Sequence, residues 1–301
     1  MRTLFIIFVT CFLTNNLDAQ ISFCVDKNYP LISFSAETKQ KLEVELKKAE
    51  SDYTASKGSL ESTIWYGRRL AYLGRYNESI EIYSIGILRF PNDARLHRHR
   101  GHRYLTLRCV DKAIEDFKVA VTLIKDRKDE IEPDGMPNAA NIPTSTLQSN
   151  IWYHLGLAYY LKKDFRNAEY AYKQCLKVST NPDMYVATAN WYYITLKELK
   201  EESQAELLLN TVSQDLLLIE NEAYLDILML YKNHDNADRL WNDLKKDSNV
   251  LMNATTGFGL GNYYRLIGDH SKAKEIFRDV TSGSQWGSFA FMAAELWQVS
   301  D

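Results

Sequence analysis

The chain has 301 residues, of which 46% are apolar and 25% charged, and its formal net charge is −3 at pH 7. This apolar content excludes a chain that is disordered throughout, and the slightly acidic balance argues against general nucleic-acid binding. Nineteen tyrosines and only six prolines favour a helical protein with aromatic packing over a loop-rich one.

Residues 1–19 have the organisation of a signal peptide. A basic start precedes an apolar run from Leu4 to Leu13, and a short polar stretch then leads to Ala19. The run is too short to cross a bilayer as a helix, which takes about 20 residues. A buried N-terminal strand or helix is the alternative interpretation. The sequence therefore predicts export, to the periplasm or out of the cell, without a transmembrane segment.

Three cysteines follow this segment, which is too few for a disulfide framework. Cys175 falls at a small-residue position of a repeat, which favours a buried thiol there. Cys24 and Cys109 either pair or stay free, and the sequence leaves both states open. Lipid anchoring through Cys24 is disfavoured, because the small residues normally found before a lipidated cysteine are missing.

Residues 20–57 contain a predicted lead-in helix. Leu42, Leu46, Ala49 and Tyr53 recur at helical spacing among lysines and glutamates, which gives the helix one apolar and one solvated face. A helix of this kind is expected to cover the end of a repeat array.

Residues 58–124 contain two copies of one helix-turn-helix pattern. Gly67 and Gly101 hold corresponding places in the two copies and lie 34 residues apart, a spacing typical of arrays of helical hairpins. The first copy continues with Leu70, Gly74, Tyr76, Ser79, Tyr83, Gly86 and Pro91, and the second with Tyr104, Ala113, Phe117 and Ala120.

The first helix of the second copy is strongly basic. Between Ala94 and Arg108 the sequence has five arginines and three histidines but no acid. A metal site is not expected there. His97 and His102 point in directions about 140° apart on a helix of 3.6 residues per turn, and no third ligand follows at a suitable spacing.

Residues 125–148 form an insertion between the second and third copies. Three of the six prolines lie here, and Pro133-Asp134-Gly135 is a strong turn signal, so a loop is predicted. Loops of this length inside compact arrays are usually functional or disordered. An ordered loop that folds back over the concave surface is favoured over a flexible spacer. The hydroxyl groups of Thr144-Ser145-Thr146 are expected to cap the helix that follows.

Residues 149–282 contain four further copies, of which the first is the clearest in the chain. Gly156 and Ala168 are placed where two antiparallel helices cross, because larger side chains would force the helices apart. Trp152 and Tyr172 fill the space beside them. The later copies are Ala205 with Leu209 and Val212, Ala237 with Trp241 and Leu244, and Gly261 with Tyr264, Gly268, Ala273, Phe277 and Val280. Six units are therefore predicted.

The chain ends in a predicted capping helix at residues 283–301. Trp286, Phe289, Met292 and Leu296 recur at helical spacing, and the outer side of such a helix is expected to be polar.

These residues fall where the tetratricopeptide-repeat motif places its own, and the chain resembles that family, most strongly between Trp152 and Cys175. The resemblance implies an all-α fold, a right-handed superhelical α-solenoid of about six helix-turn-helix repeats with flanking cap helices. The stretches Arg98–Arg103 and Glu132–Asn138 are also similar to exported bacterial members of the family that have no settled activity.

In this family the first helices of the repeats line a concave groove, so the resemblance implies that a partner binds there. The positions that correspond to the groove or extend the same surface are Arg68, Tyr72, Arg95, Arg98, His102, Tyr153 and Asn190, followed by Asn262 and Arg265. Arginine binds carboxylate and phosphate groups through paired hydrogen bonds. A peptide C-terminus or an acidic protein segment is therefore the expected ligand.

Two other interpretations of the basic helix are open. The insertion carries five acids that could pair with the arginines internally, and these are Asp126, Asp129, Glu130, Glu132 and Asp134. The charges could also form a plain solvated face. Internal pairing and ligand binding are compatible if the acidic loop is a displaceable lid.

The expected function is that of a protein–protein interaction module whose partner is a protein or peptide and not a nucleic acid. A structural adaptor in a cell-envelope complex, using the convex face of the array, is the alternative. An enzyme is least expected, because no nucleophile, base and orienting acid occur in a recognisable arrangement and no phosphate-binding loop is present. Neither a cofactor nor a metal is expected.

Overall fold

The computed structural model describes residues 29–30, 32–246 and 250–298, so the predicted signal peptide (1–19) and Cys24 lie outside the described residues. Within these residues the chain is an all-α solenoid of fourteen helices without a strand, which confirms the predicted fold class. The helices are α1 (Ala36–Ala55), α2 (Leu60–Tyr72), α3 (Tyr76–Arg89), α4 (Ala94–Thr106), α5 (Val110–Ile124), α6 (Leu147–Leu161), α7 (Phe165–Val178), α8 (Pro182–Glu198), α9 (Glu202–Asn210), α10 (Glu222–Asn233), α11 (Ala237–Lys246), α12 (Val250–Leu266), α13 (His270–Ser282) and α14 (Phe289–Gln298).

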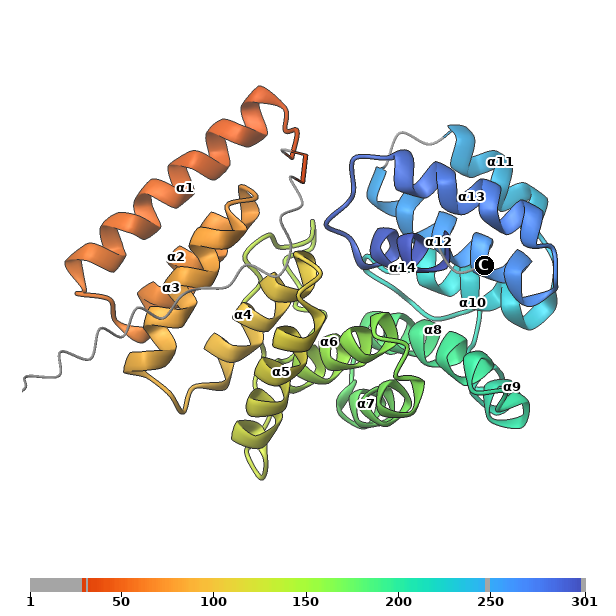
Figure 1. The fold of residues 1–301 in the computed structure, drawn as a ribbon, viewed down its shortest axis with the longest axis horizontal. Coiled ribbons are helices and arrows are strands. Elements are labelled where there is room, and N and C mark those ends of the chain that lie inside the picture. Colours follow the sequence, from red (N-terminus) through yellow and green to blue (C-terminus); the bar gives the residue numbers. More distant parts are fainter. Residues whose placement is uncertain (1–28, 31, 247–249, 299–301) are drawn as a thin grey trace, which may run out of the picture.

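Six helix pairs follow α1, as the predicted six units require (Figure 1). In five of them the two helices pack directly on each other: α2 on α3, α4 on α5, α6 on α7, α8 on α9 and α12 on α13. The remaining pair is irregular, because α11 packs mainly on α12 and hardly on α10. The insertion is also slightly shorter than predicted, since α6 begins at Leu147.

A repeated contact between a glycine and an aromatic ring sets the spacing of the regular hairpins. A Cβ atom added to Gly156 would lie 2.4 Å from the ring of Tyr172, so only glycine allows this close crossing. The same contact occurs between residues sixteen positions apart in three other units, at 2.5 Å for Gly67 and Tyr83, 3.0 Å for Gly101 and Phe117, and 2.6 Å for Gly261 and Phe277.

The turn inside each unit explains why the fourth copy is weak in sequence. One residue with a left-handed backbone follows the packing glycine by seven positions, as Lys163 (φ 60°) follows Gly156. In the fourth unit this turn residue is Lys200 (φ 59°), so Tyr193 occupies the place of the glycine. Tyr193 stacks on Tyr231 of α10, with 4.6 Å between the ring centroids. Packing against the next unit therefore replaces the close crossing within the unit.

The C-terminal helices fold back over helices in the middle of the chain. In Figure 1 the helices α10–α14 lie above α6 and α8, and both α10 on α8 and α14 on α6 are in contact. The Trp191 ring of α8 stacks on Phe258 of α12, with 5.4 Å between centroids. Because α8 is covered in this way, most of its side chains are buried, including the polar Asp183, Thr188 and Asn190.

The C-terminal segment closes this arrangement and does more than cap the last unit. Besides packing on α12 and α13, α14 contacts α6, and its Glu295 forms an ion pair with Arg108, which follows α4 (2.7 Å). Trp286, just before α14, stacks on Tyr29 with 4.4 Å between centroids and meets Tyr76 edge-on. Because the described part of this segment, up to Gln298, is packed on two sides, it lacks the expected polar outer side.

Candidate functional site

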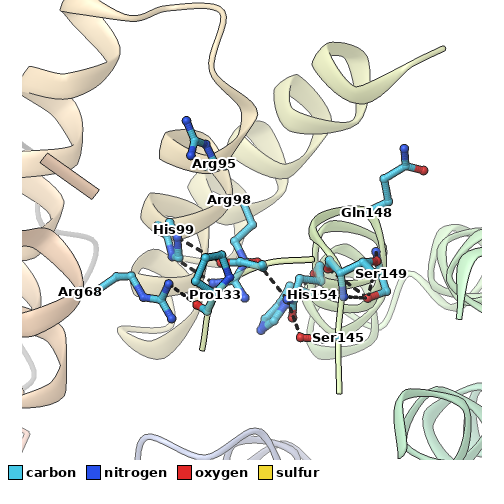
Figure 2. Close-up of polar contacts among 12 residues, drawn as sticks. Arg68, Arg95, Arg98, His99, Pro133, Ser145, Gln148, Ser149 and His154 are labelled. Carbon is cyan, nitrogen blue, oxygen red and sulfur yellow. Dashed lines mark hydrogen bonds and ion pairs between the residues drawn. The ribbon is translucent and has the colours of Figure 1, made fainter. Parts of the chain in front are cut away.

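The basic side chains of α4 point in different directions around the helix and make separate contacts. Arg95 points outward and forms ion pairs with Asp93 (2.8 Å) and with Glu61 of α2 (2.6 Å). In Figure 2, Arg95 points away from Arg98 and His99, which lie on the inner side of α4. Arg95 is therefore separated from the other predicted groove residues.

A second face of α4 packs on α5 through a buried acid that sequence analysis does not single out. Asp116 accepts hydrogen bonds from Arg100 at 2.7 and 2.8 Å, and its Oδ1 lies 3.1 Å from His97 Nδ1. The signal in the sequence was an acid directly before the packing residue Phe117, since a buried acid needs a partner. This face is structural, and it accounts for two of the eight basic residues.

The inner face of α4 holds a carboxylate from the insertion. Arg98 Nε lies 3.2 Å from Oε2 of Glu132, and His99 Nε2 lies 3.1 Å from Oε1. Asn150 of α6 donates a hydrogen bond to the same carboxylate at 2.9 Å. All four side chains are buried. Of the interpretations left open by the sequence, internal pairing is thus the one present here.

The protonation of this group follows from its contacts. Burial alone would raise the pKa of Glu132, but the charge of Arg98 and the neighbouring His99 outweigh it and hold this pKa well below its usual value. Burial lowers the pKa of His99 to about 3. Arg98 Nη1 lies 3.0 Å from His99 Nδ1 and can only donate, so that nitrogen accepts and the imidazole is neutral. The pocket around Glu132 therefore holds a guanidinium and a carboxylate in direct contact, with a neutral histidine that touches both.

The insertion continues across α2, where two arginines bind its main chain. Arg68 Nη1 donates to the carbonyl oxygen of Pro133 (2.7 Å), and Arg69 Nη1 donates to that of Gly135 (3.0 Å). Gly135 packs against Tyr72, because an added Cβ would lie 2.1 Å from the hydroxyl oxygen of this tyrosine. Figure 2 shows Arg68, Arg98 and His99 directed toward the Pro133 segment. Arg69 was not predicted.

The two ends of the insertion are tied together at its base. The backbone N–H of Leu147 donates to Glu130 (2.9 Å), and the Thr146 hydroxyl donates to the Asp129 carboxylate (2.6 Å). Thr146 also caps α6 by accepting from the backbone N–H of Ser149, so the expected hydroxyl cap is present. The segment between these ends is an Ω-shaped loop with its own closure.

His102, the next inward residue of α4, lies among other rings. Its ring centroid is 4.4 Å from that of His154 on α6 and 5.3 Å from that of Phe289 on α14. Burial lowers the pKa of His102 well below its ordinary value and that of His154 to about 3. The C-terminal segment thus covers the part of the inner surface next to His102.

The predicted groove does not continue as an open channel beyond His102. Tyr153 and Asn190 are only 8% and 3% exposed, since α10, α12 and α14 cover this part of the inner surface. Asn262 is bonded to the hydroxyl of Tyr231, and Arg265 is paired with Glu198. The expectation of one continuous groove is corrected by this closure. Arg68, Tyr72, Arg98 and His102 are the predicted residues that the structure brings together.

Residues 149–182, which make up α6 and α7, match the family model of the tetratricopeptide repeat. The glycine-to-aromatic contact of this unit recurs at the same spacing in three other units. Helices α6 and α7 are therefore a tetratricopeptide repeat. This class of fold is an interaction scaffold that presents helical surfaces to other proteins.

Several solved tetratricopeptide-repeat proteins are similar to the chain at low sequence identity. One from Parabacteroides merdae is 16% identical, with a TM-score of 0.48 over 85% of this chain and 93% of that one. YrrB, described as having an unusual peptide-binding site, is 12% identical, with a TM-score of 0.45 over 82% and 97% of the two chains. No curated protein sequence matches the chain.

Near the site, a cleft lies between α1 and α2 of the helical array. It has a volume of about 730 Å³ and includes Glu45, Trp65 and Arg69 in its lining. Arg69 links the cleft to the loop, because it donates to Gly135 and pairs with Glu45 (3.0 Å). A partner can therefore approach the loop from this side.

Other features of the described residues bear on cofactors and membranes. They contain no group of three or more histidine, cysteine and acidic side chains arranged to hold a metal ion. No helix among them has both the length and the apolar character needed to span a bilayer. Cys175 is a buried free thiol, and Cys109 is disulfide-bonded.

Proposed function

We propose that this protein is an exported interaction module that binds an acidic segment of another protein at a guanidinium cluster formed by Arg68, Arg98 and Arg103. The repeat fold supports an interaction role in general. The excess of positive charge in this cluster supports an acidic partner, because guanidinium groups form paired hydrogen bonds with carboxylates.

The observation that carries the proposal is the imbalance of charge on the inner face. Arg68 and Arg103 both lie close enough to Arg98 to interact with it electrostatically. Among the described residues, one carboxylate serves these three guanidinium groups, that of Glu132, which pairs with Arg98. Arg68 donates hydrogen bonds to the Tyr72 hydroxyl and to the Pro133 carbonyl, neither of which carries a charge. Among the described contacts, Arg103 has the ring face of Tyr76 at 5.5 Å. A ligand with more than one carboxylate would complete this arrangement.

Export is part of the proposal and rests on the sequence of residues 1–19. The disulfide-bonded state of Cys109 supports it, because disulfides persist in oxidising compartments such as the bacterial periplasm and the extracellular space.

Binding of a fluorescent hexaglutamate peptide to the mature protein tests the acidic partner. Arg103→Gln removes a guanidinium that touches neither the loop nor Glu132, and it should weaken binding by about tenfold. Arg75→Gln is the matched control, because Arg75 is an exposed arginine paired with Glu78 at the start of α3. Hexaglutamate that fails to bind at millimolar concentration, or that binds the Arg103→Gln variant as well as the wild type, contradicts the proposal.

A further inference from the structure

We infer that the segment Glu132–Gly135 of the insertion is an internal ligand, which occupies the partner site and must be displaced by an acidic segment of similar form. The inference rests on the proposed function and adds to it how the site is regulated and what its ligand presents. The loop would lower the affinity for every partner that does not compete with it.

The contacts of this segment are those that a bound peptide makes. One carboxylate, that of Glu132, enters a buried pocket formed by Arg98, His99 and Asn150. Two main-chain carbonyl groups, one and three residues later, accept hydrogen bonds from arginines of α2. Any extended acidic segment can make these contacts, because they involve one carboxylate and two main-chain carbonyl groups and depend little on the other side chains.

The tip of the loop is held by polar contacts and buries little apolar surface. Its large apolar residues are mostly in solvent, with Met136 57% and Ile142 49% exposed. Segments with few buried apolar contacts open at low free-energy cost. Replacement of the Glu132 carboxylate by a carboxylate of the partner should change the free energy little, because either ion pair with Arg98 requires the same desolvation. Exchange of one acidic segment for another is therefore possible without a large barrier in free energy.

The base of the loop does not depend on the tip. The bonds between Glu130 and Leu147 and between Asp129 and Thr146 lie outside the segment that occupies the site. The tip can leave while α5 and α6 keep their connection. The open cleft between α1 and α2 adjoins Arg69 and gives an incoming segment a path to this position.

These contacts define the ligand. It presents a glutamate or aspartate to Arg98, followed by residues whose carbonyls face Arg68 and Arg69. A proline after the acid is tolerated, because only the carbonyl of Pro133 is used. A second acid would supply the carboxylate that Arg68 and Arg103 lack in the loop-bound state.

A peptide with the sequence of residues 129–138 tests the inference directly. In one variant, residues 132–144 are replaced by a short glycine–serine linker, which leaves the base intact because Ile131 and Thr146 are bridge partners. Anisotropy of the labelled peptide should show binding to this variant at least about tenfold tighter than to the wild type, since a tethered segment competes at roughly millimolar effective concentration. A peptide with glutamine in place of Glu132 should lose this binding.

A second pair of variants covers the case in which the linker protein does not fold. Gly135→Val places a branched side chain against Tyr72 and should loosen the tip without changing a charge. Met136→Ser alters an exposed neighbour and is the control. We expect faster amide exchange in the tip and tighter peptide binding for Gly135→Val alone. Equal peptide binding by the wild type, the linker variant if folded and Gly135→Val overturns the inference, as does a folded linker variant that binds no peptide.

The outcome for hexaglutamate separates this inference from the proposed function. If hexaglutamate binds the wild type and the linker variant equally, the acidic partner stands and the internal ligand is rejected. If the 129–138 peptide binds only the opened variants while hexaglutamate binds none, the internal ligand stands and the proposed function fails.

Discussion

Glu132 of the insertion and Arg98 of α4 form a buried ion pair, with 3.2 Å between Oε2 and Nε. Removal of either charge leaves the other without a partner in the interior. Glu132→Ala should therefore lower the free energy of unfolding by about 3 kcal/mol, as measured by urea denaturation.

The double variant Arg98→Met/Glu132→Ala is the control for this prediction. If the two charges are coupled, its loss of stability should be about 2 kcal/mol smaller than the sum of the two single losses. Strictly additive losses would show that the pair contributes nothing as a pair.

The neutral histidines make the protein sensitive to acid. His99 and His154 have a pKa of about 3 in the folded state, against about 6.5 when unfolded, so below pH 6.5 the unfolded chain takes up protons that the folded chain refuses. Stability should therefore fall as the pH drops from 6.5 toward 3, by about 2 kcal/mol for each histidine at pH 5. Glu132 acts in the same direction below its unfolded pKa, because its folded pKa is lowered.

Urea midpoints at pH 7.5, 6 and 5 measure this dependence. His154→Asn keeps a donor for the carbonyl of Asn150 but does not titrate, so it should reduce the loss at pH 5 by about 2 kcal/mol. A variant with the same pH profile as the wild type would show that His154 is not the group responsible.

The close helix crossing in the third unit should not tolerate a methyl group. Gly156→Ala adds a Cβ 2.4 Å from the Tyr172 ring, and we expect a loss of about 2 kcal/mol in unfolding free energy, despite the better helix propensity of alanine. Gly101→Ala is the comparison, because its Cβ would lie 3.0 Å from Phe117. It should cost less, and a reversed order in chemical denaturation would refute the packing argument.

Trp286 should determine whether the array stays closed. Trp286→Ala removes the stack on Tyr29, the edge contact with Tyr76 and the hydrogen bond from Nε1 to the carbonyl of Pro30. We expect a loss of about 3 kcal/mol and a larger radius of gyration by small-angle X-ray scattering. Trp286→Phe keeps the ring contacts and should leave the radius unchanged.

The helix pairs are predictable from the sequence wherever glycine marks the crossing. Gly67, Gly101, Gly156 and Gly261 identify four of the six units, because a larger residue would crowd the aromatic side chain sixteen positions later. The fourth unit is harder to recognise because Tyr193 packs outward on the next unit. That contact joins residues far apart in the chain, and periodicity within a unit does not report it.

The candidate site is predictable only in part for the same reason. Helical register brings Arg98 and His102 to one face, and the acids of the insertion make internal pairing a plausible alternative. Which acid fills the pocket depends on how the loop closes at Asp129 and Thr146, a tertiary contact. Tyr153 and Asn190 are covered because the C-terminal helices fold back over them. No local sequence pattern predicts this long-range packing.

The ion pair between Arg108 and Glu295 links the last helix to the second unit, a long-range contact that open arrays lack. In an open array each unit touches only its neighbours, so stability is close to a one-dimensional sum and the end units can fray independently. Here the last helix packs on the second and third units, so unfolding from the C-terminus would expose buried surface in the middle of the chain. The molecule should therefore unfold in one cooperative transition, and a truncation at either end should lower the stability of every unit.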